Sequence, residues 1–143
     1  MTRHSVLPDL TLRIETALVD HLIQDPGVRT VLGDPPRLFV NWPRRAPFPY
    51  AVIDRHEQKP LRASGSASWE HRIDLAVYTR HGGRAEARDC LGALQAAFEA
   101  APLIVERAHI VLAHVVYADI MRTANLNAFR GLMRLRLVTE ADQ

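Results

Sequence analysis

The stretch WEHRIDLAVY, residues 69–78, decides the fold class of this chain. Its side chains alternate between a mainly apolar row and a more polar one, namely Trp69, His71, Ile73, Leu75 and Val77 against Glu70, Arg72, Asp74, Ala76 and Tyr78. An alternation with a period of two is typical of a β-strand that buries one face. The stretch therefore predicts a sheet packed on one side by other elements.

Helical spacing on both sides of this strand supplies the expected packing layer. After the turn at Gly82-Gly83, residues 84–100 carry an apolar stripe made by Ala87, Leu91, Leu94 and Phe98. Residues 9–23 carry a similar stripe made by Leu10, Ile14, Ala17, Leu18 and Leu22, with Asp9 as the expected N-cap. Asp25-Pro26-Gly27 should end this first helix, with room for one more turn at residues 28–32.

Four further strands are predicted at residues 37–42, 50–57, 109–119 and 127–140. The strand at 50–57 could bury Tyr50, Val52 and Asp54 or, more plausibly, Ala51 and Ile53, and its pattern leaves the choice open. Residues 109–119 are apolar on both faces, which favours a central strand. Three prolines make residues 43–49 a stiff loop, and residues 58–67 are expected to form a flexible hairpin loop.

The predicted fold class is therefore α+β, a mainly antiparallel four- to five-stranded sheet packed by two main helices in the order α-β-β-β-α-β-β. The 143 residues, 48% hydrophobic and 24% charged, suit one globular domain over residues 1–143 with its core in 10–140. No apolar run has the length of a membrane span, and residues 1–10 lack the apolar segment of a secretory signal, so we expect a soluble, intracellular protein without membrane contact.

The residue composition also limits which kinds of catalytic or metal-binding site are expected. The single cysteine, Cys90, excludes an internal disulfide and sits in a helical stripe, where it acts as a small apolar filler. His109 and His114 would leave opposite faces of their strand, and His71 reads as a hydrogen-bonded core histidine, so no metal site is predicted. Without a nucleophile motif or a phosphate loop, we predict no catalytic, cofactor-binding or metal-binding residues and no enzyme activity.

One charge feature has a defined geometry. Arg130, Arg134 and Arg136 should project from the same face of the last strand. They could meet phosphates, the carboxylates of a neighbouring subunit, or only water. The 18 basic and 16 acidic residues are spread evenly along the chain, which weakens a nucleic-acid interpretation without removing it.

Aromatic side chains in the proline-rich segment form the other notable feature. Trp42, Phe48 and Tyr50 could cap the edge of their own core or mark a contact surface. On a scaffold without a plausible active site, this pattern favours assembly over catalysis.

Several segments together resemble the tail-terminator, or tail-completion, family of long-tailed phages and gene transfer agents. They are RAPFPYAVI at 45–53, AVYTR at 76–80, GRAEA at 83–87 and RGLMRLRLVTE at 130–140. The likeness extends from about Leu10 to Glu140. It implies an α/β or α+β domain without catalytic residues that forms a hexameric ring, caps the tail tube and joins it to the head-side connector.

From this resemblance we expect a structural protein of the virion tail neck that is present in the host cytoplasm during assembly. Its partners would be further copies of itself, the tail tube protein and a head-side connector or stopper protein, with DNA only as passing cargo. The alternative is a small nucleic-acid-binding module that uses the arginine-bearing strand face. The candidate contact residues are Trp42, Arg44, Arg45, Phe48, Lys59, Leu61, Arg62, Arg130, Arg134 and Arg136.

Overall fold

The computed structural model describes residues 6–61, 67–124 and 127–141. Its elements follow one another as three helices and five strands: α1 (Val6–Ile23), α2 (Pro26–Leu32), β1 (Leu38–Phe39), β2 (Tyr50–Leu61), β3 (Ser68–Thr79), α3 (Gly83–Ala100), β4 (Ala108–Thr123) and β5 (Ala128–Ala141). The α+β class is confirmed. The order differs from the prediction by the short helix α2, which lies at the place where one additional turn was expected.

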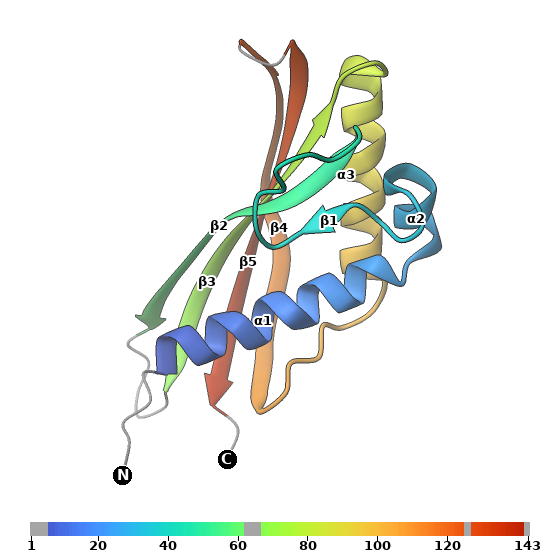
Figure 1. The fold of residues 1–143 in the computed structure, drawn as a ribbon. Helices are drawn as coiled ribbons and strands as arrows, with labels where there is room; N and C mark the ends of the chain where they lie inside the picture. Colours follow the sequence, from blue (N-terminus) through green and yellow to red (C-terminus); the bar gives the residue numbers. More distant parts are fainter. Residues whose placement is uncertain (1–5, 62–66, 125–126, 142–143) are drawn as a thin grey trace.

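The strands form a single twisted sheet in the order β1-β2-β3-β5-β4 (Figure 1). All neighbours pair antiparallel except β1 and β2, which are parallel. The long strand β3 lies in the middle and pairs along its length with β2 on one side and β5 on the other. The sheet is therefore mixed, although mainly antiparallel as predicted.

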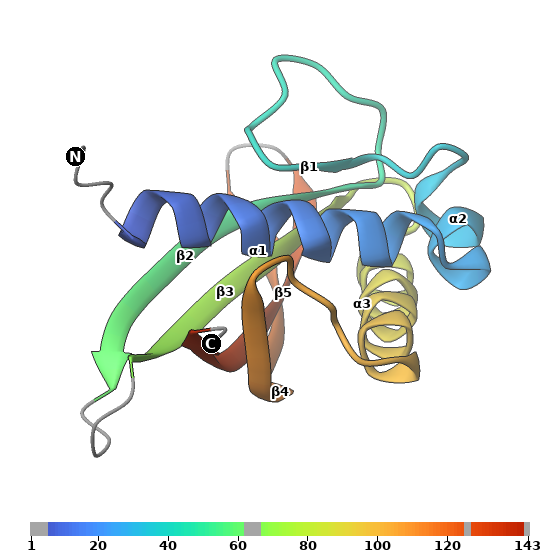
Figure 2. The ribbon, with the colours of Figure 1, turned by 90° about the horizontal axis from the view of Figure 1, so that it is seen from below.

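The main core lies between one face of this sheet and the helices. Helix α1 crosses one face of the sheet, and α2 and α3 lie side by side near the C-terminal end of α1 (Figures 1 and 2). The predicted stripes point inward: Leu10, Ile14, Leu18 and Leu22 from α1 and Ala87, Leu91, Leu94 and Phe98 from α3 are all buried. They meet the inward rows of β3 and β5, made by Ile73, Leu75, Val77, Met133, Leu135 and Leu137.

A second, smaller core occupies part of the opposite face, which we call the outer face. Tyr50, Val52, Ala76, Tyr78 and Leu132 are buried there under Phe39, Ala46 and Phe48. This arrangement resolves the open choice in β2. Ala51 and Ile53 enter the main core, while Tyr50 and Val52 enter the second one.

The predicted position of the strand at 109–119 was wrong. β4 is an edge strand of 16 residues that pairs only with β5 within the described part of the chain. Ile110, Val115 and Ile120 pack against the main core, whereas Val111 and Val116 lie at register shifts and are exposed. The two shifts explain the misleading pattern, because each inserts a residue and breaks the strict alternation.

Several boundaries also needed correction. The strand predicted at residues 37–42 is only the two-residue β1 (Leu38–Phe39). Residues 58–61 are not loop but the end of β2, paired with residues 68–71 of β3, while 62–66 lie outside the described residues. Pro60 is tolerated there because no strand pairs with the other side of β2 beyond Val52 in the described chain. Helix α1 begins at Val6, so Asp9 is not its N-cap and instead pairs with Arg13 at 3.0 Å.

A chain of polar side chains crosses the main core between α1, β2, β3 and β5. Nδ1 of His56 donates to Oε2 of Glu15 at 2.7 Å, because a carboxylate only accepts. His56 Nε2 lies 2.9 Å from His71 Nδ1, and His71 Nε2 lies 3.3 Å from the Thr139 hydroxyl. His71 is fully buried and hydrogen-bonded, as predicted. Burial, followed by the neighbouring His56, lowers the pKa of His71 to about 4.

This buried histidine predicts a loss of stability in mild acid. In the unfolded chain this histidine has a pKa of about 6.5 and is protonated below that pH. In the folded protein His71 stays neutral down to about pH 4. The free energy of unfolding should therefore fall as the pH drops from about 6.5 to about 4, by up to about 3 kcal/mol. Urea unfolding of His71→Gln should show a flatter pH dependence over this range. The exposed-site control His109→Gln should keep the wild-type slope, and an equal slope in all three proteins would contradict the assignment.

Candidate assembly surfaces

The outer face carries the predicted arginine row, and each arginine faces a carboxylate of the same chain. Arg134 holds Asp74 through two hydrogen bonds of 2.7 and 3.2 Å. Nε of Arg136 lies 2.5 Å from Oε2 of Glu70, and a guanidinium nitrogen of Arg130 lies 3.4 Å from Oδ2 of Asp54. The shared direction of the three side chains is thus confirmed, with carboxylates from β2 and β3 as their partners.

Glu70 is the centre of the largest of these clusters. Besides Arg136, it faces Lys59 at 3.4 Å and Arg72 at 3.8 Å. The hydrogen bond from Arg136 outweighs the effect of burial and keeps the pKa of Glu70 below its usual value. Because these basic groups are engaged within the chain, they leave little free positive charge for the nucleic-acid interpretation.

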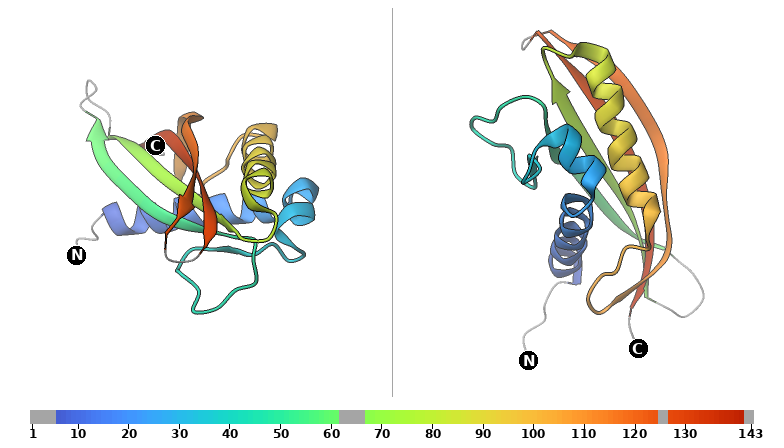
Figure 3. Two further views of the ribbon diagram at one scale, coloured as in Figure 1. Left: turned by 90° about the horizontal axis from the view of Figure 1, so that it is seen from above. Right: turned by 90° about the vertical axis from the view of Figure 1, so that its right-hand side faces the viewer.

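The proline-rich loop between β1 and β2 both caps its own sheet and projects from it. Phe48 packs on Tyr50 with ring centres 5.4 Å apart, and Trp42 packs on Tyr78 at 5.2 Å. Phe48 is partly buried, whereas Trp42 remains 51% exposed. Phe48 therefore caps the edge of its own core, whereas a contact role for Trp42 stays a prediction. The loop stands out from the body in Figures 2 and 3.

The other candidate contact residues differ in their surroundings. Arg44 and Arg45 are exposed on the loop and make no ion pair or hydrogen bond with the described residues. Leu61 is half-buried at the end of β2, and Arg62 lies outside the described part of the chain. The contact role of these residues stays a prediction.

Most of the exposed large apolar side chains of the described residues lie on β4, the strand whose sequence pattern favoured a central position. Val111, Leu112, Val116, Tyr117 and Met121 are 40–51% exposed. Their strand also leaves one edge without a partner among the described residues. A long apolar edge of this kind is a template for pairing or packing with another chain. The sequence signal for this exposed surface was the presence of apolar residues on both faces of the strand predicted at 109–119.

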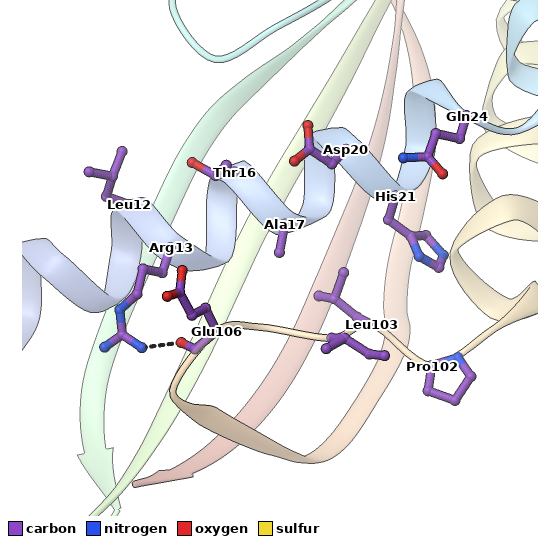
Figure 4. A pocket seen from close by; sticks show the side chains of 11 residues that line it. Leu12, Arg13, Thr16, Ala17, Asp20, His21, Gln24, Pro102, Leu103 and Glu106 are labelled. Carbon is purple, nitrogen blue, oxygen red and sulfur yellow. Dashed lines mark hydrogen bonds between the residues drawn. The ribbon is translucent and has the colours of Figure 1, made fainter. Parts of the chain in front are cut away.

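A groove lies between α1 and the segment that connects α3 to β4 (Figure 4). It has a volume of about 510 Å³. Its apolar lining includes Leu12, which is 63% exposed, and Ile104, which is 84% exposed. Arg13, on α1, spans the groove by donating to the backbone carbonyl of Glu106. The groove is thus pre-formed, and its lining combines apolar and polar side chains.

The potential metal ligands of the described residues do not cluster, and the single thiol is buried. The described residues contain no group of three or more histidine, cysteine or acidic side chains arranged to hold a metal ion. Cys90 is buried in the main core, and this burial raises the pKa of its thiol to about 12. No described helix is both long and apolar enough to cross a lipid bilayer.

Comparison with known proteins identifies the family. The model of the family described as tail completion protein gp17 matches residues 16–140. This chain is a member of the tail completion protein gp17 family. The resemblance seen in the sequence is therefore confirmed, and the family is one of structural phage tail proteins.

Two solved structures share the fold of this tail completion protein. A chain of the native gene transfer agent particle superposes with a TM-score of 0.80 at 19% identity, covering 92% of this chain and 97% of that one. The bacteriophage SPP1 gp17 protein gives 0.61 at 18% identity, with 94% of each chain covered. No curated protein sequence matches significantly.

The pairing on the outer face of this tail completion protein predicts a measurable contribution to stability. The side chain of Asp74 is only 9% exposed, so Arg134→Met leaves a nearly buried carboxylate without its partner. We expect the free energy of unfolding to fall by about 2 kcal/mol in urea titrations. Arg55→Met, in an ion pair whose two side chains are 64% and 41% exposed, should change it by less than about 0.5 kcal/mol. Equal losses in both variants would show that the Asp74 pair is merely a surface contact.

Proposed function

We propose that this protein is a tail terminator, which forms a ring at the end of the tail tube and joins the tube to the head-side connector. The observation that carries this proposal is the family match over residues 16–140. The similarity in fold to a chain of a gene transfer agent particle and to SPP1 gp17 supports it. A place in the tail neck of a virion, reached from the host cytoplasm during assembly, follows from the same proposal.

The surfaces described above suit a function made of contacts. In a ring, each copy presents one surface to one neighbour and a different surface to the other. In the proposed ring, the exposed apolar edge of β4 and the projecting loop would supply two such different surfaces. Six copies would close a ring of the kind expected from the family resemblance. The remaining exposed surface would meet the tube protein and the connector or stopper protein, without any reaction.

DNA would pass such a ring as cargo. The arginines of the outer face are held by Asp54, Glu70 and Asp74, so this face offers few free cations to phosphates.

A tube-growth assay tests the proposed function. Purified tail tube protein should form tubes whose growth stops when this protein is added, because it occupies the growing end. Electron microscopy should then show shorter tubes with an additional ring at one end. Bovine serum albumin at the same concentration serves as the control. Unchanged tube lengths together with bare tube ends would contradict the proposal.

The exposed edge strand gives a second test. Val116→Asp places a charge on a side chain that is 42% exposed at a register shift of β4. It should change the free energy of unfolding by no more than about 1 kcal/mol, because it removes little buried surface. It should nevertheless reduce ring formation in sedimentation experiments if β4 is covered by a neighbour. The shape-preserving control Val116→Thr should assemble normally, and normal assembly of Val116→Asp would exclude β4 from the contact.

A further inference from the structure

We infer that the proline-rich loop of one copy, with Trp42 at its contact surface, inserts into the groove between α1 and residues 102–106 of the next copy. This inference rests on the proposed ring and names the surfaces that hold it together. The occupant of the groove is thus a second copy of the same chain. The argument uses the distribution of apolar surface, the unpaired charges and the arrangement in space.

Exposed large apolar side chains lie in three places in the described residues. Val40 and Trp42 lie on the loop after β1, at one edge of the sheet. Leu12 on α1 and Ile104 before β4 line the groove. The other five lie on β4, where Tyr117 and Met121 pair with Arg134 and Arg130 of the outer face. Two different patches on one chain suit a head-to-tail contact, whereas a two-fold dimer needs only one self-complementary patch.

The groove has apolar side chains in its lining and a volume large enough to receive an aromatic side chain. Ala17 and Leu103 supply an apolar lining (Figure 4). Leu12 on α1 and Ile104 also line the groove. Its volume of about 510 Å³ is within the usual range for sites that enclose a compact group. Trp42 packs on Tyr78 and leaves the rest of its ring half-exposed on a loop stiffened by three prolines, so covering this exposed face would order few new degrees of freedom.

Unpaired charges on the two surfaces are opposite in sign. Arg44 and Arg45 flank the tryptophan end of the loop and are exposed. Asp20 and Glu106 line the groove, on α1 and on the facing segment respectively. Within the described ranges, none of these four side chains forms an ion pair or a side-chain hydrogen bond. The basic groups nearest the groove are already engaged, since Arg13 binds Asp9 and His21 binds the carbonyl of Ala97.

The arrangement in space excludes a contact between this loop and groove within one copy. Helix α1 separates them, with the loop above it and the segment 102–106 below it in the view of Figure 1. The right-hand view of Figure 3 shows the same separation. The two surfaces face different directions, as they must if one copy is to contact two neighbours.

Charge reversal tests this contact. The double variant Arg44→Glu with Arg45→Glu reverses the charge of the loop. The double variant Asp20→Lys with Glu106→Lys reverses the charge of the groove. Each double variant should weaken self-association in sedimentation experiments, and occupancy of tube ends, by at least about tenfold, because like charges then face each other. The variant with all four substitutions should recover most of the wild-type assembly. Asp89→Lys with Glu99→Lys, which reverses two exposed carboxylates of α3 outside the groove, should assemble like the wild type.

A fluorescence measurement provides a second readout. Trp69→Phe leaves Trp42 as the only tryptophan, and its emission should shift to shorter wavelength on assembly because the groove then covers the exposed face of the indole. Circular dichroism melting curves confirm that every variant is folded. The inference is overturned if both reversals assemble like the wild type, if the fourfold variant stays as weak as the double ones, or if Trp42 emission does not change on assembly. Wild-type protein that neither associates nor caps tubes would instead overturn the proposed function.

Discussion

The burial of both faces of β3 constrains the rest of the structure. Ile73, Leu75 and Val77 face the helices, while Ala76 and Tyr78 face the proline-rich loop. A strand covered on both sides needs a partner on each edge, and β2 and β5 supply these along its whole length. The helices must then lie on one face and the loop on the other. The packing of Trp42 from that loop on Tyr78 is a consequence of this layering.

The regular parts of the fold could be predicted because their patterns were regular. The alternation in residues 69–78 and the stripe in 84–100 each place side chains in one consistent environment. β4 was misplaced because two inserted residues, near Val111 and Val116, bring apolar groups to both faces without burying them. The end of β2 was missed because Pro60 suggests a loop, although a strand edge without a neighbour accommodates it.

Only part of the candidate surfaces could be predicted from the sequence, because strand pairing brings together residues that are far apart along the chain. The alternation in β5 fixes the direction of Arg130, Arg134 and Arg136, so this part of the prediction was confirmed. Their partners come from β2 and β3, up to 76 residues away along the chain, and only the pairing register brings them opposite. The groove beside α1 involves Ile104 in a segment without periodicity, and no local pattern in the sequence indicates it.

The burial of the single thiol affects whether subunits can become cross-linked after a particle leaves the cell. Cys90 is the only cysteine of the chain, and burial raises its pKa to about 12, so almost none of it is present as the reactive thiolate at neutral pH. A particle built in a reducing cell meets oxygen once it is released. A subunit without an available thiol forms no stray cross-links during that passage, so its contacts after release depend on the same non-covalent forces as before.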